Sequence, residues 1–338
     1  MKRFVVVAPN WLGDAVMALP AIADVRRAQP DASMVVAARP SVAALFTLVS
    51  GVDEVVALGR RERSPLSGCD AALLLPNSFR SALMVKRAGV PERWGYSTDW
   101  RGLLLTRSVP RAPSGLHQID NYRHLVRALG FPNGPDAPRI DVSHALRETG
   151  AAVLRSAGWD GRTPIVALAP GAAYGSAKRW PPSAFADLAA GLATDGVASV
   201  MVGADADRET VAEVVRAVRG RATLVDLVGK TDLPSLAAVL VNCRALVAND
   251  SGALHLAAAL GVSVTAMFGP MDERLTAPRA SGTEPRAMSD EPRAPGHVAV
   301  LTHPVWCRPC MLRECPLDHE CMRGIAVQRV LDETRRML

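Results

Sequence analysis

Residues 245–270 read ALVANDSGALHLAAALGVSVTAMFGP, and this stretch decides the fold. It contains two short apolar runs, 245–248 and 262–268, of the kind found in strands that are buried on both faces of a parallel sheet. The segment between the two runs has about the length of one crossover helix. The stretch therefore predicts a strand, a tight loop, a helix and a second strand, which is one unit of an α/β fold with a parallel sheet.

The loop in this unit carries a polar turn, Asp250, Ser251 and Gly252, at the start of the expected helix. A helix N-terminus offers free backbone N–H groups and the positive end of the helix dipole, which suits an anionic ligand such as a diphosphate. His255 follows one turn later, on the face expected to look toward that ligand. A helix cap followed by a partly exposed histidine explains the same residues without a ligand. The stretch alone leaves both interpretations open.

Composition indicates a soluble α/β protein that is rich in Ala, Val and Leu, since 49% of the residues are hydrophobic and only 4% are aromatic. The net charge of +6 is spread along the chain. It therefore favours anionic small molecules or an anionic membrane surface as partners, and disfavours nucleic acid. No run of about 18 uninterrupted apolar residues occurs, so we expect no span of a bilayer.

The first residues, MKRFVVVA, imitate a signal peptide, but Asn10, Gly13 and Asp14 interrupt the apolar run too early. We interpret them as the first strand and expect a cytoplasmic protein. Its six cysteines are then expected to be reduced.

Length predicts two domains, because 338 residues correspond to two units of roughly 150 residues. A Pro- and Gly-rich linker occupies residues 130–138, and the strand–loop–helix pattern restarts at 165–170. We place the boundary between residues 141 and 164. Two further segments are polar: the arginine-rich residues 59–68, interpreted as a solvated loop, and the Pro- and charge-rich residues 281–296. The predicted parts are residues 1–150, 151–323 and a final helical segment, 324–338.

Candidate site residues of the first half follow its expected strands. Asp14 lies in the loop after the first strand, where ligands of open α/β sheets bind, although a helix-capping carboxylate is an equal alternative. Arg80 follows another strand. Residues 93–101, RWGYSTDWR, could stack on a sugar and pair with phosphate or carboxylate through Arg93 and Arg101. A surface loop anchored by two tryptophans is the alternative for that segment.

The second half contains a loop of small residues, GAAYGSAKRWP at 171–181, directly after an expected strand. Small residues let backbone N–H groups approach a phosphate, and Lys178 supplies positive charge. The loop is not a Walker motif, because no Gly-Lys-Ser/Thr follows at the required spacing.

Four of the six cysteines lie within fifteen residues, in the pattern C-x2-C-x4-C-x5-C. This spacing is compact enough for one structural zinc ion held by thiolates, with His319 as a possible substitute ligand. Free thiols and a disulfide are the alternatives. The cysteines concerned are Cys307, Cys310, Cys315 and Cys321.

Four blocks in this order carry a family resemblance: residues 10–14 (NWLGD), 75–83 (LPNSFRSAL), 170–181 (PGAAYGSAKRWP) and 249–255 (NDSGALH). The chain resembles the heptosyltransferases of lipopolysaccharide core synthesis, in glycosyltransferase family nine. The resemblance implies the GT-B fold, with two Rossmann-like domains whose parallel sheets face a central cleft. It also implies that the final helix crosses back to the first domain. Neither half begins with Gly-x-Gly-x-x-Gly, which disfavours a nicotinamide enzyme.

The resemblance implies that the C-terminal domain binds the donor, ADP-heptose. The N-terminal domain would bind the acceptor, heptosyl-Kdo–lipid A, at the cytoplasmic face of the inner membrane, to which the protein would attach peripherally. Asp14 would be the general base of an inverting transfer to the first heptose of the inner core. Arg80, Arg93 and Arg101 are candidate acceptor contacts. The expected donor site comprises Gly171, Tyr174, Lys178, Asp250, Ser251, Gly252 and His255.

Two other classes of function remain open from the sequence. One is an epimerase or hydrolase that uses an ADP- or UDP-sugar on the same scaffold, and the other is a non-catalytic nucleotide-sugar binder. An epimerase needs further acid/base residues around the sugar, and we identify none. No cofactor is expected for catalysis, and no catalytic divalent metal, because we expect no Asp-x-Asp motif beside the diphosphate loops.

Overall fold

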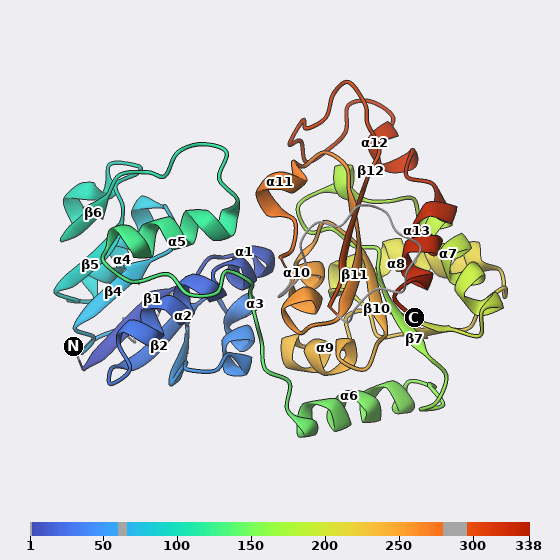
Figure 1. Ribbon diagram of the computed structural model, residues 1–338, viewed down its shortest axis with the longest axis horizontal. Coiled ribbons are helices and arrows are strands. Elements are labelled where there is room, and N and C mark those ends of the chain that lie inside the picture. The colour runs from blue at the N-terminus through green and yellow to red at the C-terminus, as the bar shows by residue number, and fades with distance from the viewer. Residues whose placement is uncertain (1, 60–65, 280–295) are drawn as a thin grey trace. The chain divides into compact units, whose positions relative to one another are not determined.

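The computed structural model describes residues 2–59, 66–279 and 296–338. The chain forms two compact units, Met1–Asp141 and Val142–Leu338, coloured blue to green and green to red in Figure 1. The predicted division at residue 150 would cut helix α6 (His144–Ser156), which is continuous and packs on α9 (Leu233–Leu240) of the second unit. The arginine-rich segment at 60–65 and residues 280–295 lie outside the described residues.

The first unit contains a six-stranded parallel sheet in the order β3-β2-β1-β4-β5-β6. The strand order reverses between β1 and β4, which pair in register from Phe4 opposite Ala71 to Val7 opposite Leu74. Such a reversal is the point at which open α/β sheets bind ligands. The strands are β1 (Arg3–Val7), β2 (Ser33–Ala38), β3 (Glu54–Ala57), β4 (Ala71–Leu74), β5 (Glu92–Tyr96) and β6 (Arg107–Val109).

Two segments of the first unit each combine more than one element. Residues 12–28 form two helices, α1 and α2, which are divided at Ala18, and Pro20 lies in the first turn of α2, where the missing N–H has no intrahelical acceptor in any case. Residues 93–101 begin inside strand β5 and end at the short 3-10 helix η2 (Arg101–Leu104). The other helical segments are α1 (Leu12–Met17), α2 (Leu19–Ala28), α3 (Pro40–Ala43), η1 (Ala44–Leu48), α4 (Phe79–Arg87) and α5 (Gln118–Ala128).

The second unit repeats this topology, with strands in the order β12-β11-β10-β7-β8-β9. Residues 245–270 form β10, α10 (Gly252–Ala259) and β11, as the apolar runs predict. Here the strand order reverses between β10 and β7. The strands are β7 (Ile165–Ala169), β8 (Ala198–Met201), β9 (Leu224–Asp226), β10 (Ala245–Asn249), β11 (Ser263–Phe268) and β12 (Val298–Thr302).

The last helix, α13 (Val327–Arg335), belongs to the second unit. It packs on α7 (Pro182–Thr194) and β11, and Trp180 donates its indole N–H to the carbonyl of Ile325 at 3.0 Å. The expectation that this helix crosses back to the first domain stays a prediction. The remaining segments are η3 (Ser176–Lys178), η4 (Asp205–Asp207), α8 (Arg208–Val218), α11 (Glu273–Thr276) and α12 (Glu320–Arg323).

The inner strands β1, β4, β7, β10 and β11 are buried along nearly their whole length, which is why they read as continuous apolar runs. The edge strands β3, β6, β9 and β12 are partly exposed. Within the ranges that the structure describes, no helix has the length and hydropathy needed to cross a bilayer.

Candidate active site

In the second unit, the loops that follow β7 and β10 are tied together by a buried ion pair. Ala169 and Ala248 face each other near the ends of these neighbouring strands, so the loops emerge side by side. Lys178 Nζ lies 2.5 Å from Asp250 Oδ2, and the two side chains are only 10% and 8% exposed. A buried charge requires a partner, so each residue holds the other in place at the point where the strand order reverses.

Asn249 fixes the backbone around this pair. Its side chain is fully buried, accepts a hydrogen bond from the Trp180 backbone N–H at 3.0 Å and donates to the carbonyl of Pro170 at 2.8 Å. The amide therefore spans both loops, and replacing it with an apolar side chain would leave two buried backbone groups unpaired. Asn249 is the first residue of the block 249–255 (NDSGALH), but the sequence of this block does not indicate that the Asn249 side chain binds the loop after β7.

Two polar atoms beside the ion pair are buried without a hydrogen-bond partner among the described residues. They are Ser251 Oγ, at the cap position of α10, and Arg179 Nε, next to Lys178. Buried polar atoms are rarely left unpaired, because each unpaired atom costs about 1–3 kcal/mol. A ligand rich in acceptor oxygens at the N-terminus of α10 can pair with the Ser251 hydroxyl.

Tyr174 adds a cation-binding surface to the same loop. Lys178 Nζ lies 4.8 Å from the ring centroid of Tyr174, and the guanidinium carbon of Arg313 lies 5.0 Å from it. The hydroxyl of Tyr174 donates to the carbonyl of Met311 at 3.1 Å, and Ala177 N–H donates to the carbonyl of Arg313 at 3.0 Å. Arg313, which the sequence analysis does not single out, therefore adds positive charge beside the predicted donor loop.

The small residues of the donor loop permit its close packing. A Cβ at Gly171 would lie 2.2 Å from the carboxylate of Asp207, and one at Gly175 would lie 2.1 Å from the carbonyl oxygen of Arg313. Gly252 begins α10, and His255 is buried within that helix rather than partly exposed.

An Asp-x-Asp sequence, Asp205 to Asp207, follows β8, and its second carboxylate is the one beside Gly171, so the expectation that no such motif lies beside the diphosphate loops is wrong. Both carboxylates are used locally. Asp205 pairs with Arg208 at 2.5 Å, and Asp207 accepts the backbone N–H of Ala204 at 2.9 Å. These contacts explain the two acidic residues as parts of the loop that leads into α8.

In the first unit, Asp14 lies in the first turn of α1 and is not its cap, since Trp11 occupies that position. The Asp14 carboxylate is hydrogen-bonded to the side chain of Tyr122 from α5. Burial, and then the charge of Asp14, raise the pKa of Tyr122, so the phenol stays protonated at physiological pH and donates to Asp14. No local pattern in the sequence marks Tyr122, which lies far from Asp14 along the chain.

The three candidate acceptor arginines have different environments. Arg93 donates from Nε to the carbonyl of Leu104 and from Nη1 to the carbonyl of Val90, both at 2.7 Å. Arg101 is fully buried and donates from Nε to the carbonyl of Tyr96 at 2.7 Å. Burial lowers the pKa of Arg101 to about 10, which still leaves it charged at neutral pH. Both side chains support backbone, so Arg80, which is exposed on α4, is the acceptor candidate that we retain.

None of the four clustered cysteines forms a disulfide bond within the described part of the chain. Cys321 is buried, and burial, followed by the charges of the three other cysteines, raises its pKa. Within the described part of the chain, no group of three or more His, Cys, Asp or Glu side chains is arranged to hold a metal ion. A structural zinc ion bound by these cysteines therefore stays a prediction from their spacing alone. A zinc content near zero by elemental analysis of the purified protein would contradict it.

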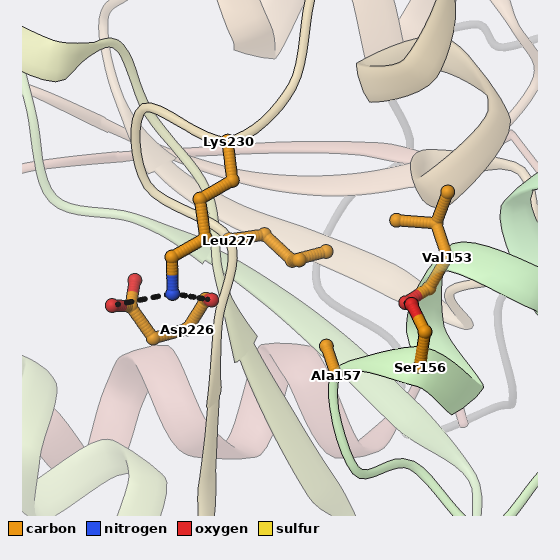
Figure 2. Close-up of a pocket in the computed structure, with 6 residues that line it drawn as sticks. All are labelled: Val153, Ser156, Ala157, Asp226, Leu227 and Lys230. Atoms are coloured by element: carbon orange, nitrogen blue, oxygen red, sulfur yellow. Dashed lines mark hydrogen bonds and ion pairs between the residues drawn. The ribbon is translucent and has the colours of Figure 1, made fainter.

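A cavity of about 610 Å³ lies elsewhere in the second unit, between the last turn of α6 and the loop after β9. Figure 2 shows Lys230 turned toward Asp226, with Val153, Ser156 and Ala157 opposite. The ammonium of Lys230 donates to the carbonyl of Asp226 at 2.8 Å. None of the predicted site residues lines this cavity.

Comparison with known proteins adds independent information. The profile of glycosyltransferase family 9 (heptosyltransferase) matches residues 60–319. Lipopolysaccharide heptosyltransferase 2 from Salmonella typhimurium and its counterpart from Escherichia coli are each 29% identical over 299 residues, which is 82% of this chain and 85% of theirs. The solved structure of E. coli ADP-heptose lps heptosyltransferase II superposes with a TM-score of 0.82 at 27% identity, and covers 100% of this chain and 98% of that one.

Proposed function

Because this chain belongs to glycosyltransferase family 9, the heptosyltransferases, we propose that it transfers L-glycero-D-manno-heptose from ADP-heptose to the first heptose of the lipopolysaccharide inner core. The names of the similar proteins from Salmonella typhimurium and E. coli support the second heptosyltransferase within the family. The acceptor in this proposal is heptosyl-Kdo–lipid A, a lipid carried in the membrane.

One observation gives the main support for ADP-heptose binding by the second unit. The buried pair of Lys178 and Asp250 stands at the reversal of strand order, next to the unpaired Ser251 hydroxyl at the start of α10. A diphosphate seated there accepts hydrogen bonds from Lys178, from Ser251 and from the first amides of the helix. Since Asp250 neutralises much of the charge of Lys178, Arg179 and Arg313 supply the additional positive charge that two phosphates require.

The reaction follows from these groups. The acceptor hydroxyl oxygen forms a bond to the anomeric carbon of heptose as the bond from that carbon to the diphosphate oxygen breaks. The departing ADP carries the negative charge, which Lys178 and the N-terminus of α10 stabilise, so no general acid is needed. Asp14 takes the proton of the attacking hydroxyl, and attack opposite the leaving group inverts the anomeric carbon.

Tyr122 is a positioning residue in this scheme. Its phenol donates to Asp14 and fixes the orientation of the carboxylate from α5. A general base is effective only when its oxygen lies within hydrogen-bond reach of the proton that it removes. The buried phenol therefore contributes to catalysis through Asp14.

Incubating the purified protein with ADP-heptose, with and without heptosyl-Kdo–lipid A, separates this proposal from the alternatives. We expect a heptosylated acceptor and ADP only when both substrates are present. Free heptose without acceptor indicates a hydrolase, an isomeric nucleotide sugar indicates an epimerase, and unchanged substrates indicate a binding protein. Each of these three results would contradict the proposed transfer.

Catalysis is expected to persist in EDTA. The proposal neutralises the diphosphate with Lys178, Arg179, Arg313 and a helix dipole, and the nearby Asp205 and Asp207 already have local partners. Turnover is measured after dialysis against EDTA and again after Mg²⁺ is added back. A loss of activity that Mg²⁺ restores would contradict the metal-independent scheme.

A further inference from the structure

Four large hydrophobic side chains are exposed on the first unit, each in a segment that follows a strand of its sheet. They are Trp11, Phe79, Trp100 and Leu103, and the described residues of this unit contain no others. All four follow the carboxyl ends of β1, β4 and β5, which are neighbours in the sheet. Single exposed hydrophobic residues are ordinary on protein surfaces, but Trp100 and Leu103 lie only three residues apart in one loop, which indicates an interaction surface.

Trp100 and Leu103 are the most exposed of the four, at 90% and 89%. Trp100 and the preceding Asp99 both adopt left-handed backbone conformations, with φ of 57° and 51°. A bulky residue avoids this region unless the surrounding structure holds it there. The backbone thus keeps the indole projecting into solvent, although folding normally buries such a side chain.

Rigid contacts beneath the loop hold it in this form. Arg101, between the two exposed side chains, is fully buried and donates to the carbonyls of Tyr96 and Pro76. Thr98 Oγ1 donates to the carbonyl of Asn77 at 3.1 Å. These bonds join the loop after β5 to the loop after β4, where Phe79 and Arg80 begin α4. We call residues 97–104 the apolar loop.

Positive charge accompanies the apolar loop. Helix α4, which packs against η2 of the apolar loop, carries exposed Arg80, Lys86 and Arg87. No ion pair to these three residues occurs among the described side chains. Exposed apolar side chains combined with unpaired cations are typical of surfaces that bind anionic membranes, where tryptophan occupies the interface and basic residues contact the headgroups.

We propose that the apolar loop inserts Trp100 and Leu103 into the interfacial region of an anionic phospholipid bilayer, while the basic residues of α4 contact the lipid headgroups. The proposal extends the proposed function, because it places the acceptor-binding unit on the membrane that carries the acceptor. Membrane binding by this loop requires neither donor nor acceptor, so it can be tested without turnover.

The test is sedimentation with acceptor-free vesicles of phosphatidylglycerol and phosphatidylcholine. The double variant Trp100→Ser/Leu103→Ser should partition at least about tenfold more weakly than the unaltered protein, since two apolar side chains no longer leave water. The matched control is Trp306→Ser/Leu317→Ser, which removes a tryptophan and a leucine that are 86% and 57% exposed in the second unit. The control should bind as the unaltered protein does, and binding should weaken as salt increases.

Three results would overturn the proposal. The unaltered protein could fail to bind anionic vesicles, the control variant could lose binding as strongly as the loop variant, or light scattering could show a dimer that only the loop variant disrupts. The last result would make a second copy of the chain the occupant of this surface. Since all four substituted side chains are exposed, unchanged melting temperatures confirm that both variants fold.

Turnover on a water-soluble acceptor without acyl chains distinguishes this proposal from the proposed function. The loop variant should retain that turnover and lose turnover on acceptor embedded in vesicles. If no variant and not even the unaltered protein transfers heptose, the proposed function fails, while the vesicle-binding comparison still decides the role of the loop.

Discussion

Asp14→Asn should lower kcat by a factor of about a hundred or more, because a general base typically contributes 10²–10⁴-fold. Asparagine keeps the shape of the side chain and can still accept the hydrogen bond from Tyr122. It cannot take the proton of the acceptor hydroxyl. ADP affinity and melting temperature should therefore remain close to those of the unaltered protein, and steady-state kinetics, calorimetry and thermal unfolding measure the three quantities.

Asp24→Asn is the matched control for this substitution. Asp24 is a fully buried carboxylate on α2 of the same unit, it pairs with Arg27, and it accepts the backbone N–H of Gly134 at 2.8 Å. Its replacement should lower the melting temperature without changing kcat per folded molecule. Full turnover by Asp14→Asn, or a loss of activity that only follows unfolding, would show that the base lies elsewhere.

Lys178→Ala should weaken ADP binding at least tenfold. A charge-assisted hydrogen bond contributes about 1.5–3 kcal/mol, and a tenfold change in affinity corresponds to about 1.4 kcal/mol. The substitution also leaves the Asp250 carboxylate buried without its partner, so the melting temperature should fall. Calorimetry is therefore performed well below the melting temperature of the variant.

Lys230→Ala provides the comparison for Lys178→Ala. Lys230 is a lysine of the same unit, paired with Asp226 at 3.3 Å, but it lines the cavity beside α6 and not the loops after β7 and β10 (Figure 2). We expect its replacement to leave ADP affinity unchanged. Equal ADP affinity in Lys178→Ala and the unaltered protein would remove Lys178 from the donor site.

The α/β fold and the family could be predicted from local patterns. Apolar runs that end in polar turns mark most strands of both sheets, and the strand–turn–helix pattern of residues 245–270 is confirmed. The family resemblance carried by four short motifs is confirmed by the match over residues 60–319 and by the structural likeness to heptosyltransferase II. These features depend on residues that are close together along the chain.

The contacts that complete the candidate site could not be predicted in the same way. Tyr122 reaches Asp14 from another helix, and Arg313 reaches Tyr174 from a distant loop. Nothing in the residues around either one marks it, because the pairing exists only after the chain has folded.

The arginines of residues 93–101 show a related limit. A basic and aromatic segment has the same sequence pattern whether its guanidinium groups bind a ligand or backbone carbonyls. Arg93 and Arg101 do the latter, and Arg101 thereby supports the loop that exposes Trp100. The sequence therefore marks residues 93–101 as unusual, but only the three-dimensional structure shows which groups their side chains bind.

The most direct test of heptosyl transfer is the structure of the product that the purified protein makes from ADP-heptose and heptosyl-Kdo–lipid A. Mass spectrometry should show an acceptor that has gained one heptose residue, and NMR of the new linkage should show an anomeric configuration opposite to that of the donor. An unmodified acceptor with free heptose in solution would contradict the transfer, and a retained anomeric configuration would contradict the direct displacement in which Asp14 is the base.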